Sequence, residues 1–90
     1  MKFDRELISN GNPMEGVVGF SRAVRVGPFI SIGGTAPVGP DGKTVGVGDV
    51  AAQTAQCIEI IKAALEQAGS GLEDVVRTRV ILTDIDDWKA

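Results

Sequence analysis

The sequence contains no histidine and no tyrosine, and it has a single cysteine and a single tryptophan among 90 residues. Without histidine, no imidazole is available for base catalysis or for metal ligation. One cysteine excludes a disulfide within the chain and is typical of a reducing compartment. The chain also lacks an apolar run of about 18 residues that could span a membrane, and residues 1–9 lack the apolar core of a signal peptide. We therefore expect a cytoplasmic protein that makes no membrane contact.

The composition is that of a globular domain whose core is aliphatic rather than aromatic. Apolar residues make up 43% of the chain, whereas aromatic residues make up only 4%. A chain of this length allows one domain at most, and it buries only about 60–65% of its surface on folding, so that partners commonly complete such domains. The net charge is −3 and no segment is strongly basic. This balance argues against nucleic acid as a partner.

Two short runs with strand-like alternation, residues 21–26 and 29–32, flank a Gly-Pro turn. This arrangement predicts a β-hairpin. Gly33 and Gly34 follow the second run, and their lack of side chains leaves the backbone amides open. Two interpretations stay open at this point. The glycine pair is either a place where a small ligand meets the main chain, or a bulge or tight contact between strands.

A long helix is predicted over residues 50–68. Asp49 precedes it as the N-cap, and Gly69 and Gly71 end it. One apolar stripe, spaced at steps of three and four residues, is expected to face the sheet; its members are Ala51, Ala55, Ile58, Ile61, Leu65 and Ala68. Cys57 lies beside this stripe, where the role of a small packing residue is favoured over that of a nucleophile.

Residues 2–8 are predicted to form a first strand and residues 75–83 a last one. Residues 84–90 have the pattern of a helix start, with Asp84 or Asp86 as the N-cap. Because so short a helix is not stable alone, the chain is expected to be a fragment of a longer protein.

Two glycine patterns look like nucleotide-binding motifs but fail in their context. Residues 39–44 end like a phosphate-binding loop, yet Pro37 occupies the position of its first glycine and no helix follows. Residues 46–51 match G-x-G-x-x-A, but the strand before them is too short for a dinucleotide-binding unit. Arg77 and Arg79 are more typical of a solvated or subunit-facing side of a sheet than of a carboxylate site. The sequence holds no complete catalytic set, and we expect neither a metal ion nor a cofactor.

The chain resembles the YjgF/RidA family (endoribonuclease L-PSP-like) over nearly its whole length, in GFSRAVRVGPFISIGGTAPV and in DGKTVGVGDVAAQTAQCIEIIKAALEQAGSGLEDVVRTRVILTDIDDW. The most specific parts are the hairpin ending in residues 34–37, the D-x-x-x-Q pattern from Asp49 to Gln53, and residues 72–76. The resemblance implies an α+β, chorismate mutase-like fold, in which helices cover one mostly antiparallel sheet. Residues 1–90 would then form a single, incomplete RidA-like domain, and the complete protein would form homotrimers with clefts between subunits.

The resemblance further implies hydrolytic deamination of small reactive imines such as 2-imino acids. In the family an arginine clamps the substrate carboxylate and an acidic residue activates water, but both belong to the last third of the family sequence. The catalytic residues are therefore unknown for this chain, which would be inactive by itself. The substrate-binding residues that carry over are Phe20, Gly33, Gly34 and Thr35.

Three residues depart from the deaminase pattern of the family. Phe20 replaces a usual tyrosine, Arg22 a common glutamine and Gly33 a frequent serine. These departures keep a second function open, that of a non-catalytic metabolite-binding or regulatory trimer. A third is a ribonuclease, a label that some members carry, although the absence of histidine and the net charge argue against it.

Overall fold

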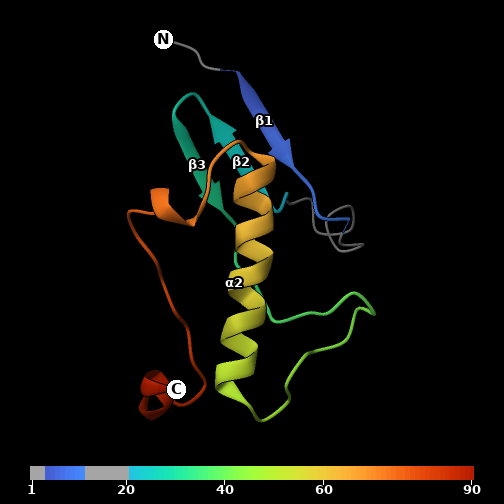
Figure 1. The fold of residues 1–90 in the computed structure, drawn as a ribbon, viewed down its shortest axis with the longest axis vertical. Coiled ribbons are helices and arrows are strands. Elements are labelled where there is room, and N and C mark those ends of the chain that lie inside the picture. Colours follow the sequence, from blue (N-terminus) through green and yellow to red (C-terminus); the bar gives the residue numbers. More distant parts are fainter. Residues whose placement is uncertain (1–3, 12–20) are drawn as a thin grey trace.

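The computed structural model describes residues 4–11 and 21–90 of the chain (Figure 1). It consists of an antiparallel sheet of three strands in the order β1-β2-β3, with one long helix against one face. The elements in chain order are β1 (Arg5–Ile8), β2 (Ala23–Val26), β3 (Phe29–Ile32), α2 (Val50–Gln67) and the 3-10 helices η1 (Leu72–Asp74) and η2 (Ile85–Lys89). Together they form the two layers of an α+β fold.

The predicted hairpin is confirmed, with β2 and β3 joined by a two-residue turn. Val26 pairs with Phe29 across Gly27 and Pro28, and Gly27 has a φ of 58°. A positive φ at the first turn position matches the twist of the strands and is open to glycine at no steric cost. The first strand is also confirmed over Arg5–Ile8, while residues 2 and 3 of the predicted range lie outside the described residues.

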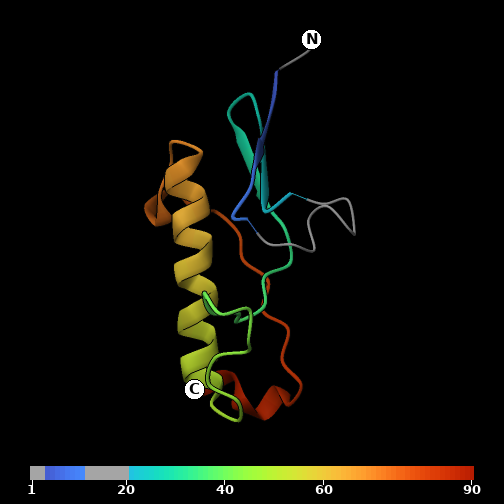
Figure 2. The same ribbon diagram turned by 90° about the vertical axis from the view of Figure 1, so that its right-hand side faces the viewer.

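The core lies where the sheet meets the C-terminal half of α2. Its buried members, each at most 3% exposed, are Ile8, Ala23, Ala64 and Ala68, with Ile30 and Ile32 packed against them. Figure 2 shows the sheet beside only this part of the helix. The two alanines allow the helix backbone to approach the sheet closely, so the interface is built from small residues on the helix and branched residues on the strands.

The predicted apolar stripe of the helix is only partly right. Leu65 and Ala68 are buried, but Ile58 is 44% exposed, and Ala51 and Ala55 are exposed as well. The physical reason is length. The helix of 18 residues is about 27 Å long, whereas strands of four residues extend only about 13 Å. The sheet therefore cannot cover the N-terminal half of the stripe.

Both ends of α2 are capped as the sequence predicts. The Asp49 carboxylate accepts a hydrogen bond from the Ala52 amide at 3.1 Å. At the other end Gly69 has a φ of 87°, and the Ser70 amide donates to the Leu65 carbonyl at 2.8 Å. These are the features of a Schellman motif. The helix thus begins and ends where its backbone groups find partners.

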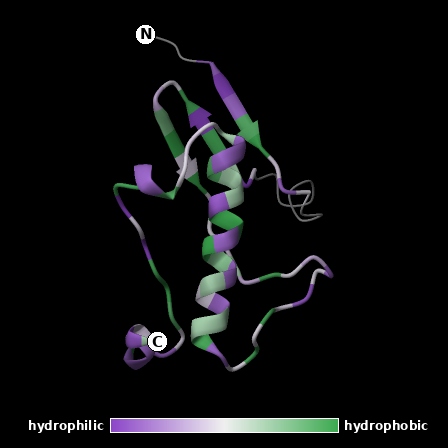
Figure 3. Cartoon of the chain, viewed as in Figure 1, coloured by the Kyte–Doolittle hydropathy of each residue, from purple (hydrophilic) through white to green (hydrophobic). Residues whose placement is uncertain are grey.

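The predicted strand over residues 75–83 is wrong, because this stretch runs extended without joining the sheet. Val76 is 99% exposed and Ile81 85% exposed. Within the described part of the chain, residues 76–83 neither donate nor accept a backbone hydrogen bond. Figure 3 shows apolar and polar residues mixed along it. Strand-like side chains alone do not make a strand; a neighbouring strand must supply the hydrogen bonds.

The predicted helix start after residue 83 forms a 3-10 helix, η2, rather than an α-helix. Asp84 is its N-cap, and its carboxylate accepts from the Asp86 amide at 3.0 Å. Among the described residues, no helix is long and apolar enough to cross a membrane.

Candidate functional site

The candidate site is the segment that leaves the end of β3 and runs to the side of α2. The Gly33 amide donates to the Arg22 carbonyl at 3.0 Å, which extends the pairing of β2 and β3 by one residue. Beyond it the chain is tied to the helix. The Cys57 thiol donates to the Thr35 carbonyl at 3.4 Å, and the Gln56 side-chain amide donates to the Val38 carbonyl at 2.9 Å. Residues 33–38 are therefore held from both the sheet and the helix.

Every carbonyl of this segment accepts a hydrogen bond. The first three carbonyls accept hydrogen bonds from side chains. The Gly33 carbonyl accepts from Thr35 at 2.9 Å, the Gly34 carbonyl from Arg22, and the Thr35 carbonyl from Cys57. The Ala36 and Pro37 carbonyls accept from backbone amides, each at 2.8 Å, and the Val38 carbonyl accepts from the Gln56 side chain. The segment thus has no unused backbone acceptor.

Three consecutive amides in the middle of the same segment have the opposite character. Within the described residues, the N–H groups of Gly34, Thr35 and Ala36 donate no hydrogen bond, and Pro37 has no N–H group to donate. Gly34 is exposed and Thr35 half-buried. A stretch of backbone with free donors and engaged acceptors suits ligand groups that accept hydrogen bonds, such as a carboxylate, a carbonyl or an imine nitrogen.

The two glycines of the pair differ in their surroundings. A Cβ added at Gly33 would lie 3.0 Å from the Arg22 guanidinium, whereas one added at Gly34 would meet nothing within 4 Å. Neither glycine has a positive φ. The tight-contact interpretation of the pair therefore fits Gly33, and the open-backbone interpretation fits Gly34.

The charge of the site comes from Arg22. Its side chain is only 4% exposed, and its guanidinium donates to the Gly34 carbonyl. Arginine stays protonated in proteins, so a positive charge lies directly behind the strand end. Cys57 adds no charge at neutral pH, because burial raises the pKa of its thiol. The local field therefore also favours an electron-rich ligand group.

Of the predicted site residues, Gly33, Gly34 and Thr35 are consecutive in this segment, and Phe20 lies outside the described residues. Two hollows of about 260 and 250 Å³ lie elsewhere, one lined by β1 and the hairpin turn and one by α2 with Asn10. Across residues 4–11 and 21–90, no group of three metal-ligating side chains is found. Sequence reasoning missed the positions of Arg22 and Gln56, since nothing in their spacing indicates which carbonyls they reach.

A helix on an antiparallel sheet, with a strand-end segment held by both, defines a small α+β protein. Residues 11–90 match the family model described as endoribonuclease L-PSP. The chain belongs to this family, which is also the YjgF and RutC family of its relatives. The resemblance inferred from the sequence is thereby confirmed.

Relatives from two archaea illustrate the match. The chain is 38% identical to a RutC family protein of Pyrococcus abyssi over 84 residues, covering 93% of this chain and 66% of the relative. It is 37% identical to a RutC family protein of Pyrococcus horikoshii, covering 93% and 67%. The chain thus spans about two thirds of the length of these relatives.

A solved structure supports the fold. A Mycobacterium tuberculosis protein, described as a member of the highly conserved YjgF/YER057c/UK114 family, is similar with a TM-score of 0.82 and 44% identity. The match covers 96% of this chain and 66% of that one. The α+β fold expected from the resemblance is confirmed by this likeness.

Proposed function

We propose that the full-length protein carrying this sequence hydrolyses small reactive 2-imino acids. In this reaction water adds to the carbon of the C=N bond, ammonia leaves, and a 2-oxo acid remains; 2-iminopropanoate and water thus give pyruvate and ammonia. The observation that supports this proposal is the strand-end segment, in which the Gly34, Thr35 and Ala36 amides have no partner among the described residues while all the carbonyls are engaged. Such donors would orient a substrate through its acceptor atoms.

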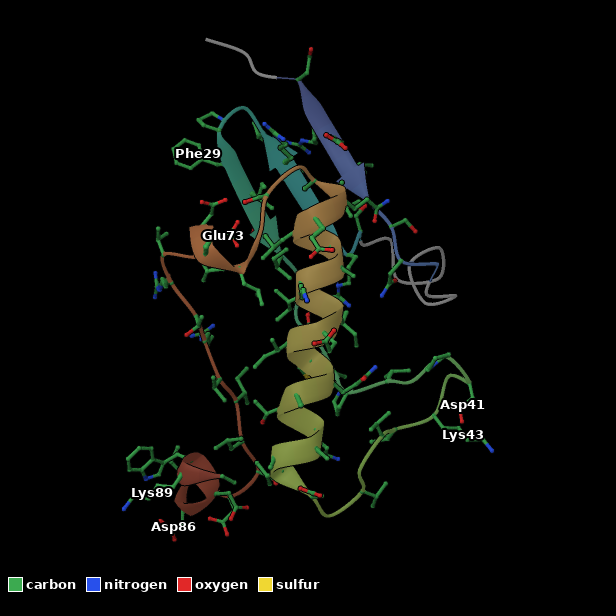
Figure 4. The ribbon with its side chains drawn as sticks, in the orientation of Figure 1. Phe29, Asp41, Lys43, Glu73, Asp86 and Lys89 are labelled. Atoms are coloured by element: carbon green, nitrogen blue, oxygen red, sulfur yellow. The ribbon has the colours of Figure 1, made fainter. Side chains whose placement is uncertain are left out.

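The proposed active unit is a homotrimer with the site in a cleft between subunits. The face of the sheet that points away from α2 supports an association of copies, because it is apolar and open. Leu7 is 62% exposed and Phe29 75% exposed, and Val24 and Val26 lie half-buried on the same face. Figure 4 shows Phe29 projecting away from the ribbon. Burial of such an exposed apolar surface against another subunit would stabilise the association.

The test is a pair of variants of the full-length protein, Gly34→Val and Lys43→Val. Valine at position 34 enters open space at the free amides and, with no positive φ to oppose it, leaves the hairpin intact. We expect turnover of 2-iminopropanoate to fall at least tenfold with an unchanged melting temperature, because the side chain blocks access to the donors. Lys43 lies in the exposed 39–44 loop, apart from the site (Figure 4), and its variant should keep full activity.

Two results would contradict the proposal. One is a wild-type protein that releases no ammonia above the buffer rate. The other is a Gly34→Val variant with normal turnover, which would move the site elsewhere.

A second candidate function, binding without catalysis, is favoured by one observation. Within the described residues, the side chains that hydrogen-bond to residues 33–38 are Thr35, Arg22, Cys57 and Gln56, and none is a carboxylate that could activate water. A protein that binds pyruvate at this segment but does not hydrolyse the imine would have this second function.

A further inference from the structure

The three free amides of the site share one structural property. Each belongs to a peptide group whose carbonyl accepts a hydrogen bond from a side chain. The Gly34 amide shares its peptide with the Gly33 carbonyl, which accepts from the Thr35 hydroxyl at 2.9 Å. The Ala36 amide shares its peptide with the Thr35 carbonyl, which accepts from Cys57 at 3.4 Å. The Thr35 amide shares its peptide with the Gly34 carbonyl, and that carbonyl accepts from Arg22.

Of these three donors, only Arg22 carries a charge. A hydrogen bond from a charged donor is about twice as strong as one from a neutral donor, and hydrogen bonds in a chain polarise one another by about 10–30%. Electron density drawn toward the Gly34 oxygen makes the N–H on the other side of the same peptide more positive. The Thr35 amide is therefore the strongest of the three free donors.

The direction of this amide also suits a ligand. The chain has no cis peptide bond among its described residues, and in a trans peptide the N–H points opposite to the carbonyl. Because the Gly34 carbonyl points at the buried guanidinium, the Thr35 N–H points away from it. Arg22, at 4% exposure, thus lies behind the peptide and has almost no surface of its own to offer a ligand.

The geometry points to Arg22 as a positioning residue that polarises the Gly34–Thr35 peptide, so that the Thr35 amide is the main donor to an acceptor oxygen of an anionic 2-oxo or 2-imino acid. This inference rests on the proposed function, and it names the Thr35 amide as the group that favours an anionic substrate. It also explains why glycine occupies position 33. A Cβ there would lie 3.0 Å from the Arg22 guanidinium and would force it to shift where it meets the carbonyl.

The experiment is a pyruvate titration of the full-length protein, followed by the 15N–1H signals of residues 33–36. In the wild type the Thr35 amide proton should move furthest downfield. Arg22→Gln removes the charge and should weaken pyruvate binding about three- to tenfold, with the largest loss of shift at Thr35. Arg22→Lys keeps the charge and should restore most of the affinity. Gly33→Ala keeps the arginine but crowds its guanidinium at the Gly34 carbonyl, and it should change the affinity and the Thr35 shift in the same direction as Arg22→Gln.

Arg25→Gln is the matched control. Arg25 is the other arginine of this region, and its guanidinium donates to the Ala68 carbonyl at the end of α2 instead of to the site. Its variant should melt at a lower temperature while keeping the wild-type affinity and the wild-type Thr35 shift.

Three outcomes would overturn the inference. Arg22→Gln with wild-type affinity and shifts would do so, and the proposed function would still stand if the wild type hydrolyses 2-iminopropanoate. Arg22→Lys and Arg22→Gln losing affinity equally would show that only packing matters. A wild type whose amides at 34–36 do not respond to pyruvate would also overturn it, and if hydrolysis is absent as well the proposed function fails with it.

Discussion

Residues 23–32 and residues 75–83 both have strand-like sequences rich in branched apolar residues, but they have opposite environments in the molecule. In the first region Ala23 is 1% exposed and pairs with Ile32 across the hairpin. In the second, Val76 and Ile81 are 99% and 85% exposed, and the backbone of residues 76–83 forms no backbone hydrogen bond within the described part of the chain. In the first region each strand finds its partner across a turn of two residues, whereas the second region would need a partner strand from a distant part of the sequence.

The difference shows what stabilises a strand in a protein this small. A hairpin closes with little loss of chain entropy, and it is then covered by α2. An isolated extended segment gains neither the hydrogen bonds of a ladder nor burial of its apolar face. The variants with the largest expected effect place the same charge at Ile8, which pairs with Ala23 of the hairpin, and within residues 75–83.

Ile8→Asp and Ile81→Asp form the first pair of variants. Ile8 is 2% exposed within the core, and burying an unpaired carboxylate there costs several kcal/mol, about as much as a small domain's whole stability. We expect Ile8→Asp to be unfolded by circular dichroism and Ile81→Asp to melt like the parent. A large loss of stability in Ile81→Asp would show that residues 75–83 are packed in solution.

The second pair compares two aspartates that cap helices, Asp49 at α2, which covers the hairpin, and Asp84 at η2, which follows residues 75–83. Asp49→Ala removes the hydrogen bond to the Ala52 amide and should lower the free energy of unfolding by about 1 kcal/mol. Asp84→Ala removes the same kind of bond from η2, which has no buried residue, and the loss should be below about 0.5 kcal/mol. Urea denaturation measures both, and equal losses would mean that η2 contributes to the cooperative fold.

The smallest effect concerns thiol chemistry. Burial raises the pKa of Cys57, so its thiol stays protonated at neutral pH and should react slowly with iodoacetamide, faster only at alkaline pH. A Thr78→Cys, Cys57→Ser variant places the thiol in the exposed segment, where it should react at the rate of a free thiol. Equal rates at pH 7.5 would contradict the difference in burial.

The same raised pKa has a consequence for stability. Since the folded protein holds the Cys57 proton more tightly than the unfolded chain, this contribution is complete at neutral pH. It is lost as the pH rises above the ordinary thiol value of about 8.5 and through the raised one. Replacement of Cys57 by serine should remove this alkaline dependence.

Local patterns in the sequence predicted the local structure well. The hairpin, the caps of α2 and the glycine at its end follow from residue types next to one another in the chain, such as Asp49 and Gly69. The strand over residues 75–83 and half of the helix stripe were predicted wrongly, because they depend on whether a distant element covers them. The sequence pattern of Ile58 is the same whether or not a sheet lies over it.

The candidate site divides in the same way. The glycine pair was evident from the sequence, since glycine is the one residue type that leaves backbone open on both sides. The hydrogen-bonding partners of the segment were not, because Arg22, directly before β2, and Cys57, in α2, reach it over 12 and 22 residues of chain. Tertiary contacts over such separations have no periodicity that a single sequence reveals.

The hydrogen bond from Arg25 to the Ala68 carbonyl sets an order for the folding of the chain. It joins residues 43 positions apart, so it cannot form while the helix is folding as an isolated segment. Most of the stability of a helix in a protein comes from tertiary packing, whereas a β-hairpin forms within about 1–10 μs. The C-terminal end of α2 is therefore fully stabilised only after the hairpin has docked. Protection of the Gly69 and Ser70 amides from hydrogen exchange, since they donate to the Glu66 and Leu65 carbonyls, measures when the sheet docks.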